Sequence, residues 1–372
     1  MINVSYWEIK SWLTDIDYTV IGSGIVGLNC AISLKKRFPK SKIVVLEKGV
    51  FPHGASTKNA GFACFGSLSE ILDDLKSHSE EEVKTLVSKR IQGLKLLREN
   101  LGDKTISYHQ NGGYELFSDT DNTFFNECIS QIENINKLLY PIFKRDTFYL
   151  NANKFGFKNI QNKYVFTPFE GQLDTGEMMN ALIIKAQTLG VKILNNITVK
   201  RFSDVTNSVQ IETNYFDFKT SKLFIATNGF ASQLLNEPVK PARAQVLITK
   251  PIDHLHIKGT FHLDKGYYYF RNINDRVLFG GGRNLDFKTE ETTEFGQTDL
   301  IQNHLEMLLK NTILPDVSFE IDHRWSGIMG VGCSKRTIVK QVSDNVFCGV
   351  RLGGMGVAIG SLIGNEMTAL LE

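Results

Sequence analysis

The spacing of hydrophobic residues along the chain predicts a mixed α/β protein that begins with a strand, a helix and a second strand. Short apolar runs at 17–21 and 42–47 indicate two buried strands. Between them, residues 25–37 carry apolar side chains at helical spacing, among them Ile25 and Leu28. A βαβ unit of about 30 residues is the usual start of a nucleotide-binding domain.

The rest of the chain predicts further helices and strands. We expect helices at 80–101, 123–139, 175–189, 295–310 and 357–371, and strands at 113–117, 191–194, 209–213, 222–227, 244–249, 267–271 and 276–280. Residues 150–162 have no clear hydrophobic period and are expected to form turns.

The order of these elements predicts an α/β fold with two lobes, because β-rich segments interrupt the nucleotide-binding ones. One lobe is expected to be Rossmann-like and built from discontinuous segments, and the other to be an α+β substrate lobe with an antiparallel sheet. The predicted boundaries are 1–85, 165–240 and 320–372 for the first lobe, and 86–164 and 241–319 for the second.

A glycine-rich turn joins the first strand to the first helix. Gly22, Gly24 and Gly27 match the GxGxxG pattern, which allows a tight turn, a close approach of the backbone to a pyrophosphate, and close packing of helix on strand. The helix N-terminus then attracts the negative charge of the pyrophosphate. Glu47 ends the next strand, 20 residues after Gly27, where a carboxylate can bind ribose hydroxyls and disfavours a 2′-phosphate.

NAD and FAD both bind to such a turn, and two further segments favour FAD. Residues 54–61 form a loop of small residues whose amides and hydroxyls suit a pyrophosphate and leave room for a flat ring. Residues 347–358 pass from a strand through Gly353, Gly354 and Gly356 into the last helix. The N-terminus of that helix would stabilise the negative charge of a reduced flavin.

We therefore expect these segments to bind FAD. Their predicted cofactor-binding residues are Gly22, Gly24, Ile25, Val26, Gly27, Glu47, Lys48, Ala55, Ser56, Thr57, Asn59, Ala60, Gly61, Arg351, Gly353, Gly354, Met355, Gly356 and Val357. For Arg351 two interpretations stay open, a positive charge beside the flavin and a plain surface charge.

Composition narrows the classes of partner. The net charge of the 372 residues is +2, which indicates no nucleic-acid partner, and no segment has the length of a membrane span. The five cysteines form no CxxC pair and predict reduced thiols in a cytoplasmic protein. His254-Leu255-His256 lacks the further ligands of a metal site, so no metal is expected. We interpret the aromatic segment 5–13 as an arm packed on the core, with a membrane-surface helix as the alternative.

Taken together, the motifs resemble those of the D-amino-acid oxidase (DAO) superfamily of FAD-dependent oxidoreductases, which includes glycine, sarcosine and gamma-glutamylputrescine oxidases. The resemblance rests on the Gly22–Gly27 turn with Glu47, the 54–61 loop, Ala226–Gly229 and the Gly353–Gly356 turn. It covers nearly the whole chain and is specific for the fold and for FAD, but not for the substrate.

The resemblance also implies positions around the cofactor. Val199 should face the adenine side through its backbone, and Thr227, Asn228 and Gly229 should lie near the pyrophosphate and ribose. Ser56, Asn59, Ala60 and Gly61 should approach the isoalloxazine ring.

Two departures from the relatives shape the expected chemistry. Cys333 is displaced from the position of the cysteine that binds flavin covalently in some relatives, which matches nearer Gly327, so we expect non-covalent FAD. Gly354 stands where sarcosine oxidases carry a lysine near the flavin. The electron acceptor, oxygen or another, therefore stays open. The sequence also leaves the oligomeric state open.

The substrate site is expected in the β-rich lobe. Arg324 and Arg271 are the two candidates to bind a substrate carboxylate, because a guanidinium matches it bidentately. Arg324 is also similar in position to the carboxylate-binding arginine of glycine oxidase. Tyr267 and Tyr269 share one face of a strand and can form an aromatic wall, and Trp325 can cover the pocket. For each of these residues a purely structural role is the competing interpretation.

We therefore predict an FAD-dependent oxidase or dehydrogenase of an amine or amino acid, which transfers a hydride to flavin N5 and produces an imine that hydrolyses. A 2-hydroxy-acid dehydrogenase and a tRNA-modification oxidase of the same fold are the alternative enzymes. An FAD-binding protein without turnover is a further alternative.

Overall fold

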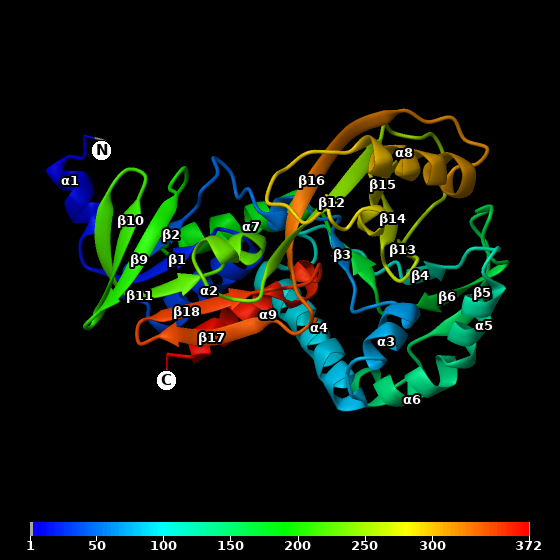
Figure 1. Cartoon of the computed structure of the whole chain (residues 1–372), viewed down its shortest axis with the longest axis horizontal. Helices are drawn as coiled ribbons and strands as arrows, with labels where there is room; N and C mark the ends of the chain where they lie inside the picture. The colour runs from blue at the N-terminus through cyan, green and yellow to red at the C-terminus, as the bar shows by residue number, and fades with distance from the viewer. Residues whose placement is uncertain (1–2, 372) are drawn as a thin grey trace.

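The computed structural model describes residues 3–371 and contains two large sheets with a layer of helices between and around them (Figure 1). The first sheet has the order β17-β18-β11-β1-β2-β8, and the hairpin of β9 and β10 extends it from β11. Its strands are β1 (Ile16–Ile21), β2 (Ile43–Leu46), β8 (Lys192–Leu194), β9 (Val199–Val205), β10 (Ser208–Thr213), β11 (Asp217–Ile225), β17 (Ile338–Ser343) and β18 (Val346–Val350). The strands β8, β2, β1, β11 and β18 run parallel, as in a nucleotide-binding sheet.

Three helices pack against the first sheet, and a fourth, α4 (Glu80–Leu101), packs on α9 (Gly356–Ala369). The three are α2 (Ile25–Arg37), α7 (Thr175–Thr188) and α9. Glycine allows α9 to approach α2 closely, because a Cβ at Gly364 would lie 2.7 Å from the Cys30 amide nitrogen. The two ends of the chain thereby form one core, in which Leu28 and Ile363 are completely buried.

The second sheet has the order β16-β12-β15-β14-β13-β4-β6-β5 and lies at the other end of the molecule (Figure 1). Its strands are β4 (Gly113–Leu116), β5 (Tyr149–Ala152), β6 (Lys163–Thr167), β12 (Lys240–Thr249), β13 (Thr260–Leu263), β14 (Tyr268–Ile273), β15 (Arg276–Gly281) and β16 (Ile321–Val331). The predicted antiparallel sheet is confirmed except for the parallel pair of β13 and β4. The short strands β3 (Phe62–Ala63) and β7 (Gly171–Gln172) pair separately.

Helix α8 (Asp299–Leu308) covers one face of the second sheet over its central strands. Leu247, Phe270 and Phe279 point to this face and pack with Ile301 and Leu305 of α8. The alternate residues of the same strands point to the opposite face. That opposite face is turned toward the first sheet, so the side chains on it line the space between the lobes.

The sheets divide the chain at places that differ from the predicted lobe boundaries. Strand β6 spans the boundary expected at 164/165. Strand β16 lies in the segment 320–372, which was assigned to the first lobe, but it pairs with β12 of the second sheet along its whole length. The division into domains stays a prediction, whereas the membership of each strand in its sheet is now defined.

Most predicted elements occur, with local corrections. The helix expected at 123–139 is two helices, α5 (Asn122–Ser130) and α6 (Ile132–Phe143), and Pro141 lies within the second instead of ending it. The helix expected at 295–310 begins only at Asp299. Strand β5 lies partly in the region expected to form turns. Helix α3 (Leu68–Leu75) was not predicted, although Ser67 and Glu70 form a capping box at its start.

The N-terminal arm departs from the preferred interpretation. It consists of α1 (Tyr6–Glu8) and a π-helical turn (Ile9–Leu13), none of whose residues is buried. Tyr6 and Trp7 are 66% and 69% exposed, and only Leu13 packs partly against the core. Among residues 3–371, no helix is both long and apolar enough to cross a membrane.

The contact between α4 and α9 provides a test of the packing. We expect Gly93→Ala to lower the stability by about 1–3 kcal/mol, because an added Cβ would overlap the Ala358 carbonyl and overpacking costs that much. Thermal unfolding of both proteins measures the change. Gln92→Ala, at the exposed neighbouring position, is the control and should leave the midpoint unchanged.

Candidate active site

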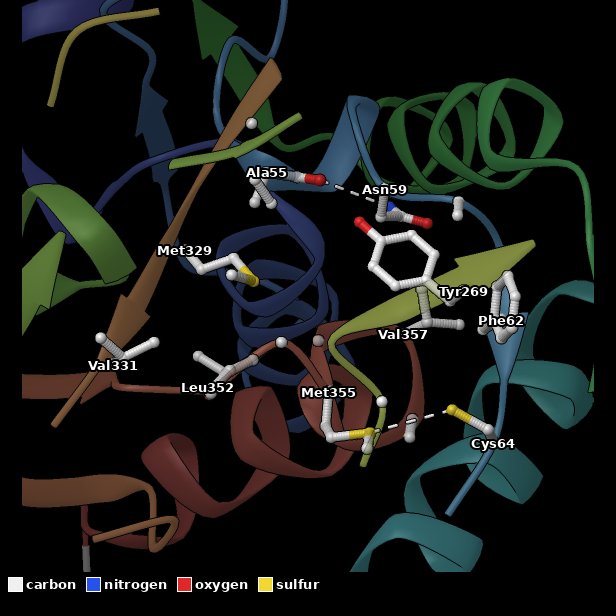
Figure 2. Close-up of a pocket in the computed structure, with 18 of the residues that line it drawn as sticks. Ala55, Asn59, Phe62, Cys64, Tyr269, Met329, Val331, Leu352, Met355 and Val357 are labelled. Carbon is white, nitrogen blue, oxygen red and sulfur yellow. Dashed lines mark hydrogen bonds between the residues drawn. The ribbon is translucent and has the colours of Figure 1, made fainter. Parts of the chain in front are cut away.

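A cavity of about 350 Å³ opens between the two sheets. One wall is formed by the start of α2, the loop 55–60 and the turn 352–358, and the other by residues of the second sheet. Figure 2 shows Tyr269 and Phe62 on one side of this cavity, with Met329, Val331 and Leu352 on the other. Its size is within the range of pockets that hold small molecules.

The glycine-rich turn has the close contacts that its pattern predicts. Gly22 has φ +101°, and a Cβ there would lie 2.8 Å from the Ala226 carbonyl oxygen. A Cβ at Gly27 would overlap the carbonyl of Gly22. Helix α2 has no side-chain cap at Gly24, and Ser56 Oγ accepts a hydrogen bond of 3.0 Å from Ile25 N. The helix N-terminus is thus directed at the cavity and joined to the 54–61 loop.

Glu47 holds this turn in place. Its Oε2 atom accepts hydrogen bonds from Ser23 N and Ser23 Oγ at 3.0 and 2.8 Å, while Oε1 accepts one from Gly49 N at 2.9 Å. The side chain is 7% exposed. Glu47 thereby fixes the glycine turn to the segment that follows β2. Glu47 itself is not part of the cavity lining.

The C-terminal turn presents a second uncapped helix. Gly353 and Gly354 have φ values of +59° and +85°, and α9 starts at Gly356 without a side-chain cap. Asn228 Oδ1 accepts a hydrogen bond of 3.2 Å from Leu352 N and holds the turn against the segment after β11. The side chain of Arg351 points away from the cavity and donates from Nε to the Arg336 carbonyl at 2.9 Å.

These features fit a dinucleotide with an anionic pyrophosphate and a flavin ring. Two helix N-termini, from α2 and α9, meet at one cavity with free donor capacity. Thr227 Oγ1 is buried without a hydrogen-bond partner, which is unusual unless a ligand completes the site. Thr227 lies directly before Asn228, which lines the cavity.

The structure brings many of the predicted cofactor residues together. Thirteen line the cavity: Gly24, Ile25, Val26, Ala55, Ser56, Asn59, Ala60, Asn228, Gly353, Gly354, Met355, Gly356 and Val357. The others are outside this lining: Gly22, Gly27, Glu47, Lys48, Thr57, Gly61, Val199, Thr227, Gly229 and Arg351. Their role as cofactor ligands stays a prediction.

Neither predicted substrate arginine lines the cavity. Arg324 pairs in register with Leu247 and therefore points to the helix-covered face, where it donates to Gln302 Oε1 and Glu306 Oε1, both at 2.6 Å. Arg271 is 2% exposed and donates to the carbonyls of Ala60 and Leu173. Burial lowers the pKa of Arg271 to about 10. These contacts indicate structural roles for both, with Arg271 holding the loop that carries Ala60.

The aromatic wall is partly as predicted. Tyr267 and Tyr269 both line the cavity, and Gly280 leaves room for the second ring, because a Cβ there would lie 2.7 Å from Tyr269 Cε2. Burial raises the pKa of Tyr269 to about 12, so it is a neutral phenol at physiological pH. Trp325 donates from Nε1 to the Lys58 carbonyl at 2.9 Å and supports the cofactor loop rather than covering the pocket.

The sequence analysis missed an arginine that does line the cavity. Arg283 follows β15, and its guanidinium lies 4.8 Å from the centre of the Phe287 ring. Within residues 3–371 it has no hydrogen-bond or ion-pair partner. Burial lowers its pKa, but an arginine remains charged at neutral pH. The signal that could have found it is the Gly280–Gly282 run directly before it, which marks a close approach of backbone to other groups.

All five cysteines are free thiols, and one of them lies in the cavity wall. Cys30, Cys64, Cys128 and Cys348 are buried and free, and Cys333 is exposed. Cys64 lies 3.9 Å from the Met355 sulfur in the cavity wall (Figure 2). In the described part of the chain, no three histidine, cysteine or acidic side chains are grouped as metal ligands would be.

The fold and this site define a flavin-dependent oxidoreductase. The chain belongs to the DAO family of FAD-dependent oxidoreductases, whose family model matches residues 17–370. The predicted cofactor FAD and the predicted family are thus confirmed. A curated relative is the bifunctional protein ThiO/ThiG of Synechocystis sp., 25% identical over 248 residues, which cover 63% of this chain. The match spans 33% of that relative's length.

Solved structures confirm the fold. The L-proline dehydrogenase of P. horikoshii is 20% identical with a TM-score of 0.76, and the match covers 96% of this chain and 93% of that one. The glycine oxidase of Geobacillus kaustophilus is 18% identical with a TM-score of 0.77, over 95% and 94% of the two chains. At such identities the likeness concerns the architecture alone.

Glu47 allows a test of the cofactor site. We expect Glu47→Gln to weaken FAD binding about tenfold, because the uncharged amide is a poorer acceptor for Ser23 and for ribose hydroxyls. Titration of the flavin-free protein with FAD, followed by fluorescence, measures the affinity. Glu212→Gln, on β10 outside the cavity lining, is the control, and equal affinities for all three proteins would contradict the assignment.

Proposed function

We propose that this protein oxidises the C–N bond of an amino acid or another amine that carries a carboxylate, with hydride transfer to FAD and release of an imine that hydrolyses. The observation that carries this proposal is Arg283, a charged side chain in the wall of the cavity whose guanidinium has no hydrogen-bond or ion-pair partner among residues 3–371. A partly buried guanidinium without an acceptor is costly unless a ligand supplies one.

The side chains around Arg283 support binding of a small organic anion. Arg283 is placed to accept a carboxylate, since its fork of N–H donors matches two oxygens. Tyr267 and Tyr269 line the same cavity and offer apolar ring faces, and Val246 packs with Tyr269 in one apolar cluster. The FAD of this family supplies the hydride acceptor when bound. The protein then has to orient the substrate, exclude water and keep the reacting amine neutral.

The relatives favour an amine substrate. The solved neighbours include proteins described as a glycine oxidase, an L-proline dehydrogenase and an iminodiacetate oxidase, whose names all refer to amines with a carboxylate. The electron acceptor and the oligomeric state are not part of the proposal. The free cysteines support the predicted cytoplasmic location.

A 2-hydroxy acid is the second candidate substrate, because Arg283 would bind its carboxylate equally well. An anaerobic titration distinguishes the two classes. Bleaching of the flavin absorbance by amino acids, and not by the matching 2-hydroxy acids, is the expected result. Bleaching by hydroxy acids alone would replace the proposal by the second candidate.

Arg283 also provides a direct test by mutation. We expect Arg283→Ala to raise the dissociation constant of a carboxylate-bearing substrate roughly 10- to 100-fold, because the charged hydrogen bonds are lost. The constant is obtained from the rate of flavin reduction at increasing substrate concentration. Arg324→Gln is the matched comparison and should change the constant less than twofold, since Arg324 lies on the opposite face. The reverse result would restore Arg324 as the carboxylate ligand.

A further inference from the structure

A buried histidine and a glutamate form a pair in the wall of the same cavity. His262 lies on β13, in register with Tyr269 on β14 and with Glu115 on β4. It is 5% exposed and lines the cavity beside Phe62, whose ring centre lies 5.4 Å from that of the imidazole. The proposed hydride transfer makes no use of this histidine.

Glu170 holds one nitrogen of His262. The Nε2 atom lies 2.8 Å from Glu170 Oε2, and Thr260 Oγ1 donates to the same oxygen at 2.9 Å. Glu170 is completely buried. Space for it is left by Gly113, at which a Cβ would lie 2.6 Å from Glu170 Cδ. The sheet is thus shaped to hold a carboxylate behind the histidine.

This arrangement determines which nitrogen is available to a ligand. A carboxylate oxygen only accepts, so Nε2 carries a proton and donates it to Glu170 in both the neutral and the charged imidazole. The remaining nitrogen, Nδ1, has no hydrogen-bond partner within the described residues. In the neutral form Nδ1 has a free lone pair, which is the state of a general base oriented by a carboxylate.

The charges around His262 favour its protonated form. Burial by itself lowers the pKa of His262, but Glu170, by its charge and hydrogen bond, together with Glu70 on α3 and Glu115 on β4, outweighs it and raises the pKa to about 9. Glu115 accepts hydrogen bonds from Ser67 Oγ and Ser69 N. A base with such a pKa matches the ammonium group of an amino acid, from which it would have to remove a proton.

Other titratable groups of the cavity are less suited to this task. Tyr269 is a neutral phenol whose pKa burial raises to about 12. Lys265 lies 3.9 Å from Asp73, and Lys335 forms an ion pair with Asp74 at 2.6 Å. Glu70 Oε2 accepts from Ser67 N as part of the cap of α3. Of these groups, His262 combines a fixed orientation with a nitrogen that has no hydrogen-bond partner within residues 3–371.

We propose that His262, oriented by Glu170, is the base that accepts a proton from the ammonium group of the bound substrate. The substrate loses this proton from nitrogen to Nδ1 and becomes a neutral amine, while His262 becomes an imidazolium. This neutral amine is the form from which bound FAD would accept the α-hydrogen with two electrons as a hydride, with an iminium ion as the product. The inference rests on the proposed amine oxidation and adds the residue that prepares the substrate for it.

The test is the pH dependence of flavin reduction by an amino acid, measured by anaerobic stopped flow on the FAD-loaded protein. In the wild type, the limiting rate should rise with pH and have a midpoint near the His262 pKa of about 9. In Glu170→Gln the midpoint should fall by about 1 to 3 pH units, because the partner that stabilises the imidazolium has lost its charge. A merely structural role of Glu170 would lower the rate without moving the midpoint in this direction.

His262→Gln is the second variant. Its limiting rate should fall roughly 100-fold or more, and its pH midpoint should follow the ammonium pKa of each substrate in a series rather than stay constant. His304→Asn, on the helix-covered side of the second sheet, is the control and should keep the wild-type profile. An NMR titration of protein labelled in its eight histidines measures the pKa of His262 in the absence of substrate. The His262→Gln variant assigns the resonance.

The outcomes separate this inference from the proposed function. Reduction by amino acids, with a midpoint that stays constant in Glu170→Gln, overturns the role of the pair and leaves the amine oxidation standing. A wild-type rate in His262→Gln has the same meaning. Failure of every amine and amino acid to bleach the wild-type flavin at any pH overturns both the proposed amine oxidation and the role of His262 as a base. A downward shift in Glu170→Gln, with the lost rate in His262→Gln, supports the base.

Discussion

The contact between α2 and α9 is the constraint on which the site depends. These helices come from opposite ends of the chain, and each directs its N-terminus at the same cavity without a side-chain cap. They can do so because Gly360 and Gly364 let α9 approach α2 closely, with hypothetical Cβ atoms at 2.7 Å from Ile25 Cγ2 and the Cys30 amide nitrogen, respectively. A separation of the two helices would divide the anion-binding site.

The second sheet decides which side chains reach the cavity. Residues alternate between two faces, so Trp325 and Arg324 point in opposite directions although they are adjacent in the chain. The row that crosses the sheet through His262, Tyr269 and Gly280 lies on the cavity side. Along this row the side chains change from the polar His262 on β13 to the aromatic Tyr269 on β14 and then to Gly280 on β15, which has no side chain. Such a surface suits a small substrate with both polar and apolar parts.

Buried charges in this protein belong to two groups that differ in their partners. Arg271 is fully engaged with the carbonyls of Ala60 and Leu173 and serves to hold a loop. Arg283 and His262 line the cavity, and within residues 3–371 neither the Arg283 guanidinium nor His262 Nδ1 has a hydrogen-bond partner, so a ligand can supply one. The partners of a charge, rather than its residue type, therefore distinguish a structural arginine from a binding one.

The sequence alone determined the family, the cofactor and the elements that bind it, because these depend on local patterns. The glycines at 22, 24 and 27 and the helix that follows are defined by backbone sterics within a few residues, and α2 (Ile25–Arg37) has the predicted bounds. Only the tertiary structure decided which side chains face the substrate. Arg271 and Arg324 matched the expected residue type, but strand orientation turns Arg324 to the face covered by α8, and hydrogen bonds to Ala60 and Leu173 hold Arg271 outside the cavity lining. Long-range packing brings Arg283 and His262 into the lining instead. Such contacts join residues up to 211 positions apart, as in the bond from Arg271 to Ala60, and no local pattern encodes them.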